Sequence, residues 1–338
     1  MKLSIHSKIR DYDVVIEQNI IKKINKYLDN NQRYVIITED GIPEIYIDTM
    51  TNQLSNYHLI EFNQGESSKN IDMYLNIIQE LNDISFTKKD ILIALGGGVV
   101  SDITGFIAST YLRGVEYIQI PTTLLAQVDA SIGGKTGLNH LNNKNIIGSI
   151  YPPSLVLIDP QTLLTLSNRQ MNNGMAEVIK CALINSKELF ELIQNKNYFY
   201  QIEKIIYLSL KTKIKYIELD EFDQHERHVL NFGHTLGHAY ESYYKYHKYL
   251  HGEAIALGMY QMIRNQTLRN KVKLLLEQYH LPISDSLDPY ELFDFIKKDK
   301  KRIDQSIKII VLNEIEKPEI ITVTLKEYLH DYLERKLI

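Results

Sequence analysis

The first 160 residues alternate between short apolar runs and stretches of helical spacing, and this alternation restricts the fold more than any other feature. The apolar runs are rich in β-branched residues and end in Gly, Pro or Asp, which is typical of buried parallel strands. They cover residues 34–40, 90–98, 117–123 and 155–160. Residues 67–83 carry apolar side chains at helical spacing. The pattern predicts an α/β fold in which helices cover a parallel sheet.

The pattern changes after residue 160. From about 161 to 295 the chain is mostly helical in pattern, with two long amphipathic stretches at 174–196 and 251–279. Two later strand-like runs predict a hairpin, which a final amphipathic helix follows. These runs are residues 306–312 and 318–325.

Length, composition and charge limit the classes of protein to which the chain can belong. At 338 residues it is too long for the usual single core, so we predict two domains, residues 1–160 and 161–338. Hydrophobic residues make up 44% of the chain, which is typical of an ordinary globular protein. The net charge of −4, with both signs interspersed, offers no basic surface for a nucleic acid.

Cysteine usage and hydrophobicity indicate the compartment. Cys181 is the single cysteine of the chain, so an internal disulfide is impossible. No apolar run reaches the roughly 18 residues that span a bilayer, and the N-terminal residues alternate in polarity, unlike a signal peptide. We expect a cytoplasmic protein without a nucleic-acid or membrane partner.

A glycine-rich turn, LGGGVVSDITGF, joins an apolar strand to a helix at residues 95–106. Glycines at such a turn let the backbone approach a phosphate and direct free N–H groups at it. Ser101 occupies the last glycine position of the dinucleotide-binding pattern, so the turn alone is as compatible with tight packing as with a nucleotide site. Asp102, in the first helical turn, suits a hydroxyl better than a phosphate.

The segment 117–153 is unusually rich in small and polar residues for a stretch that follows a buried strand. A long polar loop inside a compact domain is usually functional. The GGKT sequence at 133–136 resembles the end of a phosphate-binding loop, but no glycine precedes it at the required spacing, so we reject that interpretation. The candidate residues of this segment are Thr122, Thr123, Asp129, Lys135, Lys144 and Asn145.

Glu177 and Lys180 are three residues apart and therefore share one face of a predicted helix. On these residues alone, an exposed ion pair is the simplest interpretation, because such pairs are common on helix surfaces.

Four histidines fall within residues 230–254. His234 and His238 project from the same helix face, the arrangement by which two imidazoles can reach one cation, and His251 begins the next helix. His247 lies among tyrosines and lysines and is expected to be exposed. The spacing favours a metal site but leaves open which histidines are ligands.

Five motifs, taken together, resemble the 3-dehydroquinate synthase family. They are GGGVVSDITGFIASTYLRGVEYIQIPTTLLAQVDASIGGKTGLNH, KNIIGSIYPP, GMAEVIK, LNFGHTLGHA and HGEAIALGM, in this order between residues 96 and 259. The resemblance implies an NAD-dependent lyase with one divalent metal, zinc or cobalt. Such an enzyme converts 3-deoxy-D-arabino-heptulosonate 7-phosphate, a sugar-phosphate acid, into 3-dehydroquinate and phosphate. It also implies a homodimer.

The resemblance assigns the two domains and the metal ligands. It implies an α/β NAD-binding domain with a parallel-sheet core at 1–160, followed by a mainly helical metal- and substrate-binding domain at 161–338. The implied ligands are Glu177, His234 and His251, which replaces the exposed ion pair as the interpretation of Glu177.

Further residues are assigned by position in the same motifs. The implied catalytic residues are His238, Lys135, Lys180, Asn145 and Asp129. Substrate contacts are implied for Arg113, Lys213, Arg227, Asn231 and one lysine of 297–301, with Lys300 preferred. Contacts with NAD are implied for Gly65, Glu66, Lys69, Gly97, Gly98, Val99, Val100, Ser101, Asp102, Thr122, Thr123, Lys135, Lys144, Thr162, Leu163, Leu164 and Thr165, with Glu39 as a weaker ribose candidate.

The sequence departs from the family pattern at three positions. Ser101 stands where glycine is usual, Asp223 where glutamate is expected, and His225 where glycine is usual. Two other activities fit the same superfamily: a related sugar-phosphate cyclase such as 2-deoxy-scyllo-inosose synthase, and a metal-dependent polyol dehydrogenase. A neutral polyol has no use for lysines 135, 144, 180 and 213, which argues against the dehydrogenase. An inactive binding protein would be expected to have lost a ligand or Lys180, and none is lost.

Overall fold

The computed structural model describes residues 1–338 except 142, 196, 300–305 and 337–338. It divides into two compact units, each formed by two segments of the chain. The first unit contains Met1–Met171 and Ile202–Ile214, and the second contains Asn172–Gln201 and Lys215–Ile338. No helix among the described residues is long and apolar enough to cross a membrane.

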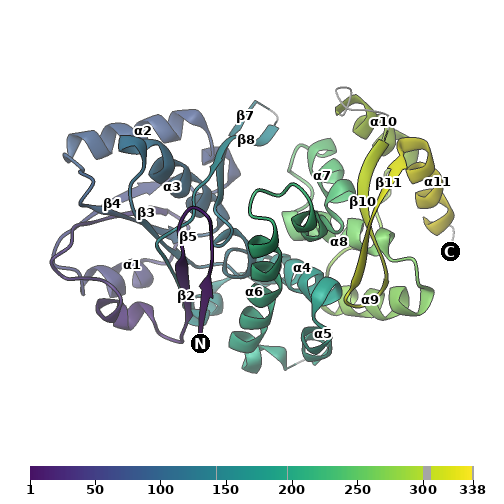
Figure 1. Ribbon diagram of the computed structural model, residues 1–338, viewed down its shortest axis with the longest axis horizontal. Coiled ribbons are helices and arrows are strands. Elements are labelled where there is room, and N and C mark those ends of the chain that lie inside the picture. The colour runs from purple at the N-terminus through teal and green to yellow at the C-terminus, as the bar shows by residue number, and fades with distance from the viewer. Residues whose placement is uncertain (142, 196, 300–305, 337–338) are drawn as a thin grey trace. The chain divides into compact units, whose positions relative to one another are not determined.

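The first unit is built on a seven-stranded sheet with the order β1-β2-β9-β6-β5-β3-β4. Strands β2, β3, β4 and β5 of this sheet are labelled in Figure 1. All neighbouring strands are parallel except β1 and β2. The strands are β1 (Lys2–Ile5), β2 (Tyr12–Ile16), β3 (Tyr34–Glu39), β4 (Tyr57–Phe62), β5 (Ile91–Gly96), β6 (Tyr117–Pro121) and β9 (Leu155–Ile158). The predicted parallel sheet is therefore confirmed.

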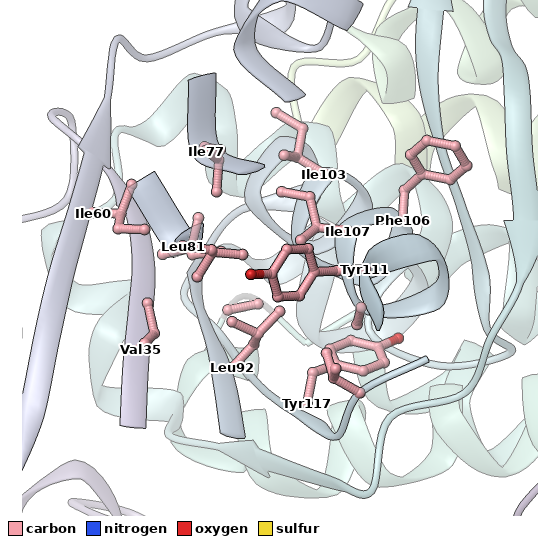
Figure 2. Packing of buried hydrophobic residues seen from close by; sticks show 14 of the residues in the cluster. Val35, Ile60, Ile77, Leu81, Leu92, Ile103, Phe106, Ile107, Tyr111 and Tyr117 are labelled. Atoms are coloured by element: carbon pink, nitrogen blue, oxygen red, sulfur yellow. The ribbon is translucent and has the colours of Figure 1, made fainter. Parts of the chain in front are cut away.

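Alternating side chains of the parallel strands supply two apolar cores, one on each face of the sheet. Val35 of β3 belongs to the core that includes Ile77 and Ile103, whereas Ile36 belongs to the core that includes Met50. Figure 2 shows the first of these cores, in which α2 and α3 cover the sheet. The helices of this unit are α1 (Glu44–Thr51), α2 (Ile71–Asp83) and α3 (Gly98–Thr110). Since residues one apart face opposite sides of a strand, a strand buried on both faces reads as a continuous apolar run.

Two segments of the first unit differ from the expected pattern. The N-terminal residues form β1 and β2, which extend the sheet, and the polar segment after β6 contains a hairpin. This hairpin consists of β7 (Lys135–His140) and β8 (Asn143–Ile150), which pair antiparallel. The strand predicted at 117–123 is confirmed by β6, but the loop expected after it was wrong for residues 135–150, where strand pairing satisfies the backbone of the polar stretch.

The second unit is mainly helical, as predicted. Its helical segments include α4 (Asn168–Asn185), α5 (Lys187–Ile193), the end of α6 (Ile202–Leu219), α7 (His234–Tyr243), α8 (His251–Met262), α9 (Gln266–Gln278), α10 (Pro289–Asp299) and α11 (Leu325–Lys336). The predicted hairpin is confirmed as β10 (Ser306–Glu314) and β11 (Lys317–Thr324).

Two stretches that were expected to be single helices are each divided. Ser186 separates α4 from α5 and accepts a hydrogen bond from the backbone N–H of Leu189. Asn265 caps α9 in the same way, through the N–H of Leu268. Both side chains satisfy N–H groups at a new helix start, so the apolar periodicity continues across a break in the backbone.

Helices α4, α7 and α8 approach one another to backbone contact. A Cβ atom added at Gly258 of α8 would lie 1.9 Å from the carbonyl oxygen of Gly233, the residue before α7. A Cβ atom at Gly252 would lie 2.0 Å from the carbonyl oxygen of Asn173 in α4. Only glycine permits these separations, so the relative positions of the three helix segments are fixed by main-chain contact.

The loop between α7 and α8 is held by Asp285. Its carboxylate accepts hydrogen bonds from the Tyr244 hydroxyl at 2.8 Å, the Tyr249 hydroxyl at 2.5 Å and the Lys248 ammonium at 2.5 Å. Burial alone would raise the pKa of Asp285, but these three donors and the N–H of Leu287 outweigh burial and lower the pKa to about 2. The loop that leads to His251 is therefore anchored by a charged, fully paired carboxylate.

Candidate functional sites

The second unit brings one carboxylate and two imidazoles together from three helices. Glu177 lies within α4, whereas His234 and His251 are the first residues of α7 and α8. One ligand atom from each of the three residues lies within 4.8 Å of the others. The Nε2 atoms of His234 and His251 lie 3.9 Å and 3.7 Å from Oε1 of Glu177. The three residues that the family resemblance assigns to a metal are thus neighbours in space.

The remaining nitrogen of each imidazole faces an acceptor on the other side of its ring. Nδ1 of His234 lies 3.2 Å from the carbonyl oxygen of Phe232, and Nδ1 of His251 lies 3.5 Å from Oε2 of Glu241. A proton on Nδ1 leaves the lone pair on Nε2 available to a cation. Both rings can therefore direct an Nε2 lone pair toward Glu177.

Glu177 and Lys180 form the ion pair expected from their spacing, but the pair is buried. Their side chains are only 1% and 3% exposed. The interpretation as a surface pair is wrong, since helix periodicity does not reveal what covers a helix face. Burial alone would raise the pKa of Glu177, yet the positive charges of Lys180 and His251 lower it to about 2.

The two histidines differ in their electrostatic surroundings. Burial and the nearby Lys180 ammonium lower the pKa of His234 well below its usual value. Burial also opposes protonation of His251, but the carboxylates of Glu177 and Glu241 outweigh it and raise the pKa of that imidazole. A divalent cation at Nε2 would require the neutral form of this imidazole and would itself supply positive charge beside the two carboxylates.

The donor set of Glu177, His234 and His251 fits a divalent metal. Two imidazole nitrogens and one carboxylate oxygen, with a position left for substrate, form the usual first shell of a catalytic zinc site. The same set also suits cobalt, because imidazole and carboxylate bind both cations. A buried anionic oxygen with two converging imidazoles is the feature of this structure on which the fit rests.

His238 differs from the other two histidines in exposure. Its side chain is 60% exposed, whereas those of His234 and His251 are 13% and 25% exposed. Its ring centroid lies 5.2 Å from that of His234. An exposed imidazole beside Glu177, His234 and His251, the candidate metal group, can exchange protons with a substrate, which a metal-bound imidazole cannot do.

A cavity of about 400 Å³ opens beside these histidines. It is lined by His228, Asn231, His234, Thr235, His238, Ala239, Ser242, Phe295, Ile296, Lys308 and Ile310. Of the residues assigned to substrate, Asn231 lies on this wall. Lys308 was missed by the sequence reasoning, and its ammonium pairs with no other described side chain. Lys308 lies between the buried Ile307 and Ile309 in β10, and this alternation in the sequence was the signal that its side chain points away from the core.

Arg227 lies shortly before α7, as do two of the three departures from the family pattern, Asp223 and His225. Arg227 is buried, and its Nη1 donates to the carbonyl oxygen of Glu221 at 2.6 Å. Asp223 lies 3.2 Å from the ring of His228, and His225 donates its backbone N–H to Asp220 at 2.6 Å. Lys300, the preferred lysine of 297–301, lies outside the described residues.

The first unit gathers most of the nucleotide candidates at the carboxyl ends of its strands. Glu39 ends β3, Gly97 follows β5, and Thr122 follows β6. The N–H of Gly65 lies 3.4 Å from Oε2 of Glu39. A Cβ atom at Gly97 would lie 3.3 Å from Thr123 and 3.7 Å from Glu39. Crevices at the carboxyl ends of parallel strands are the usual ligand sites of such sheets.

Thr122 carries a buried hydroxyl that hydrogen-bonds to none of the described residues. Its side chain is enclosed at the end of β6, with the residue only 5% exposed. Buried polar groups normally have partners, so an unpaired hydroxyl at this edge is available to a ligand.

Lys69 and Asp102 form a buried ion pair at the same end of the unit. Their side chains are 4% and 18% exposed. Burial raises the pKa of Asp102 even though Lys69 opposes the increase. Asn139 holds this region, since its side chain donates to Glu66 at 2.7 Å and its N–H donates to the carbonyl of Lys69 at 2.8 Å.

Another pair joins α6 to the segment after β6. The Lys213 ammonium donates to both the carbonyl and the carboxylate of Asp129 at 2.6 Å. Two residues assigned to different roles, substrate binding and catalysis, are therefore in direct contact.

The remaining candidates of the first unit are more dispersed. Lys135, Lys144 and Asn145 belong to the β7–β8 hairpin, whereas Val99, Val100 and the buried Ser101 belong to the first turn of α3. The Thr162 hydroxyl accepts a hydrogen bond from Gln127 at 3.0 Å, and that of Thr165 lies 3.1 Å from the Tyr46 hydroxyl. Leu163 is buried, Leu164 is 62% exposed, and Arg113 is exposed in a short turn after α3.

Comparison with protein families gives two adjacent matches. Residues 59–173 match the 3-dehydroquinate synthase N-terminal model, and residues 174–302 match the 3-dehydroquinate synthase C-terminal model. A 3-dehydroquinate synthase of Clostridium beijerinckii is 41% identical over 326 residues, which cover 90% of this chain and 93% of that protein.

Two solved synthase structures share the architecture of this chain. A 2-deoxy-scyllo-inosose synthase complexed with carbaglucose-6-phosphate, NAD⁺ and Co²⁺ matches with a TM-score of 0.88 and 24% identity, over 99% of this chain and 100% of that chain. A 2-epi-5-epi-valiolone synthase from Streptomyces hygroscopicus with NAD⁺ and Zn²⁺ matches with a TM-score of 0.86 and 25% identity, over 98% of both chains.

Proposed function

The chain belongs to the 3-dehydroquinate synthase family, and we propose that it converts 3-deoxy-D-arabino-heptulosonate 7-phosphate into 3-dehydroquinate and phosphate. The observation that carries this proposal is the convergence of Glu177, His234 and His251 in a chain with full-length similarity to such synthases. The enzyme is a carbon–oxygen lyase, because phosphate leaves by β-elimination. Oxidation and reduction cancel within each turnover.

Two bound groups are proposed to support this chemistry. Glu177, His234 and His251 would hold one zinc or cobalt ion, and the strand ends near Glu39, Gly97 and Thr122 would hold NAD. Bound there, NAD supplies reversible hydride transfer at C5 of the substrate and the metal supplies polarisation of the C5 oxygen. The NAD⁺ and Co²⁺ or Zn²⁺ in the two related cyclases support these assignments.

The side chains of the enzyme are proposed to bind charge and to move protons. His238 is exposed beside the metal group and would accept the proton of the C5 hydroxyl as the hydride leaves. Lys180 would hold the substrate close to Glu177, and Asn231 would donate a hydrogen bond from the cavity wall. Further cationic and polar groups, proposed to bind the substrate carboxylate and phosphate, are Arg113, Lys135, Lys213, Arg227 and Lys300, with Asp129 and Asn145 as orienting groups.

The decisive assay measures phosphate release and NADH together. With the heptulosonate phosphate, a metal and catalytic NAD, we expect phosphate to be released over many turnovers while NADH absorbance stays flat. NADH accumulating with a polyol would support a dehydrogenase instead. No turnover with metal and NAD present would support a binding protein.

A related cyclase is the second candidate, favoured by the TM-score of 0.88 to 2-deoxy-scyllo-inosose synthase. Glucose 6-phosphate, whose carba analogue is bound in that structure, tests it directly. Turnover of glucose 6-phosphate at a higher kcat/KM than the heptulosonate phosphate would favour the second candidate.

The proposal includes expectations about domain roles, localisation and oligomeric state. Residues 1–160 would form the NAD-binding domain and 161–338 the metal- and substrate-binding domain. We expect a homodimer because the family resemblance implies one. We expect a cytoplasmic location because the single cysteine cannot form an internal disulfide. Sedimentation analysis checks the dimer, and metal analysis of the purified protein distinguishes zinc from cobalt.

A further inference from the structure

Glu241 is a buried carboxylate that the proposed chemistry does not use. It lies on α7 three residues after His238, so the two side chains share one face of the helix. Its side chain is only 2% exposed. A carboxylate is rarely buried without a specific partner, because its desolvation is costly.

Glu241 contacts the outer nitrogen of a proposed metal ligand. Oε2 of Glu241 lies 3.5 Å from Nδ1 of His251, whereas Nε2 of the same ring lies 3.7 Å from Glu177. The imidazole of His251 therefore stands between two buried carboxylates. One of them belongs to the metal group, and the other lies behind the ring.

His234 offers an internal comparison. Its Nδ1 faces the backbone carbonyl of Phe232 at 3.2 Å, and its Nε2 faces Glu177. Each ligand histidine thus has one acceptor behind it: a neutral carbonyl for His234 and a charged carboxylate for His251. An acceptor at Nδ1 fixes the ring orientation and the tautomer, and a charged one also makes Nε2 a stronger donor to a metal.

We infer that Glu241 is a positioning residue for the metal centre, which holds Nδ1 of His251 so that Nε2 faces the cation. The inference rests on the metal centre of the proposed function. The competing possibility is that Glu241 is itself a ligand, since one ligand atom each of His238, Glu241 and His251 also lies within 4.8 Å of the others. These two roles differ in what they require of His238, whose Nε2 lies 3.9 Å from Glu241.

Cobalt affinity of the metal-stripped, full-length protein tests the inference. Titration with Co²⁺, followed by the visible spectrum and by calorimetry, should show an affinity about 10–100-fold weaker for Glu241→Ala than for the wild type. Glu241→Gln should recover most of this loss, because its amide oxygen can accept a hydrogen bond from Nδ1 of His251. Glu253→Gln is the matched control: Glu253 accepts the N–H of Leu250 at the same helix start, at 2.8 Å, and its change should leave Co²⁺ affinity unaltered.

A double-mutant cycle separates positioning from general structural damage. In a His251→Ala background, Glu241→Ala should weaken Co²⁺ binding no further, since Glu241 acts only through that ring. His238→Ala should retain wild-type affinity. Equal losses from His238→Ala and Glu241→Ala would overturn the inference in favour of a ligand role.

The remaining outcomes separate failure of the inference from failure of the metal centre. Wild-type affinity in Glu241→Ala would overturn the positioning role alone. Absence of Co²⁺ binding by the wild type would overturn the metal centre, and the inference with it. If Glu241→Ala does not fold, as judged by circular dichroism, Glu241→Asp replaces it and should weaken binding because its shorter side chain withdraws from Nδ1.

Discussion

The candidate metal group and the candidate nucleotide edge, which is formed by the strand ends around Glu39, Gly97 and Thr122, are built from different parts of the polypeptide. The metal group consists of side chains from three helices, and a buried carboxylate lies at its centre. The nucleotide edge consists mainly of strand ends and glycine backbone around Gly97, with a few side chains such as Glu39 and Thr122. A site made of side chains should fail when one of them is removed. A site made of backbone should lose affinity gradually.

Glu177→Ala should produce the largest effect, and this effect should be confined to the metal group. Loss of the one carboxylate ligand should abolish stoichiometric metal and reduce kcat/KM by about a thousandfold or more, because the proposed Lewis acid is lost. Metal analysis and the phosphate-release assay measure both. NAD affinity, measured by calorimetry, should stay within about twofold. Retained metal content with full activity would refute the ligand assignment.

His238→Asn should distinguish the proposed proton-transfer role of His238 from the proposed metal-binding role of His234 and His251. We expect kcat to fall about 10²–10⁴-fold, the usual range for removal of a general acid or base, while metal content stays at the wild-type level. Steady-state kinetics and metal analysis on the same preparation check this. Loss of metal together with activity would instead make His238 a ligand.

Thr122→Val should have a moderate effect confined to the nucleotide side. Replacing the unpaired hydroxyl should weaken NAD binding by about 1 kcal/mol, or roughly fivefold, because one hydrogen bond is lost. Thr104→Val is the matched control, since the Thr104 hydroxyl is also buried and without a described partner, but lies within α3. An equal loss of NAD affinity in both variants would show that the hydroxyl of Thr122 has no special role.

Asp285→Asn should have the smallest effect on catalysis and should mainly lower the stability of the fold. Removing the charge that anchors the α7–α8 loop should lower the free energy of unfolding by about 1–3 kcal/mol, seen as a lower Tm. Metal affinity should change by less than about threefold, because the helix contacts remain.

The pH dependence of this effect follows from the pKa of Asp285. The folded pKa of about 2 lies below the ordinary value of about 3.9, so the carboxylate stabilises the fold above about pH 4. That contribution is lost as the pH falls toward about 2. The Tm difference between wild type and variant should therefore be full at pH 7 and smaller at pH 3. A constant difference across this range would contradict the assignment.

Much of the first unit could be predicted because its strands are buried on both faces. Residues 34–40 and 155–160 read as continuous apolar runs, and each contains a strand of the sheet. The hairpin at 135–150 could not be recognised in the same way. Its residues are polar and glycine-rich, so its pairing is set by the backbone and leaves no apolar alternation.

The metal group shows a different limit of sequence reasoning. Helical spacing predicted that His234 and His238 share a helix face. It could not predict that Glu177 and His251, from two other helices, also lie beside His234. The burial of the Glu177–Lys180 pair depends on helices far along the chain, which periodicity within α4 does not report. Glu241 was missed for the same reason, although its spacing of three from His238 was visible.

The glycine contacts among α4, α7 and α8 limit how the metal preference of this centre could change. With Gly258 against the Gly233 carbonyl and Gly252 against the Asn173 carbonyl, the helices are already at their closest approach. Any larger residue at these positions could only push them apart. A tighter site for a smaller cation would therefore have to come from the side chains that would bind the ion or orient the histidines, because the helices cannot move closer together.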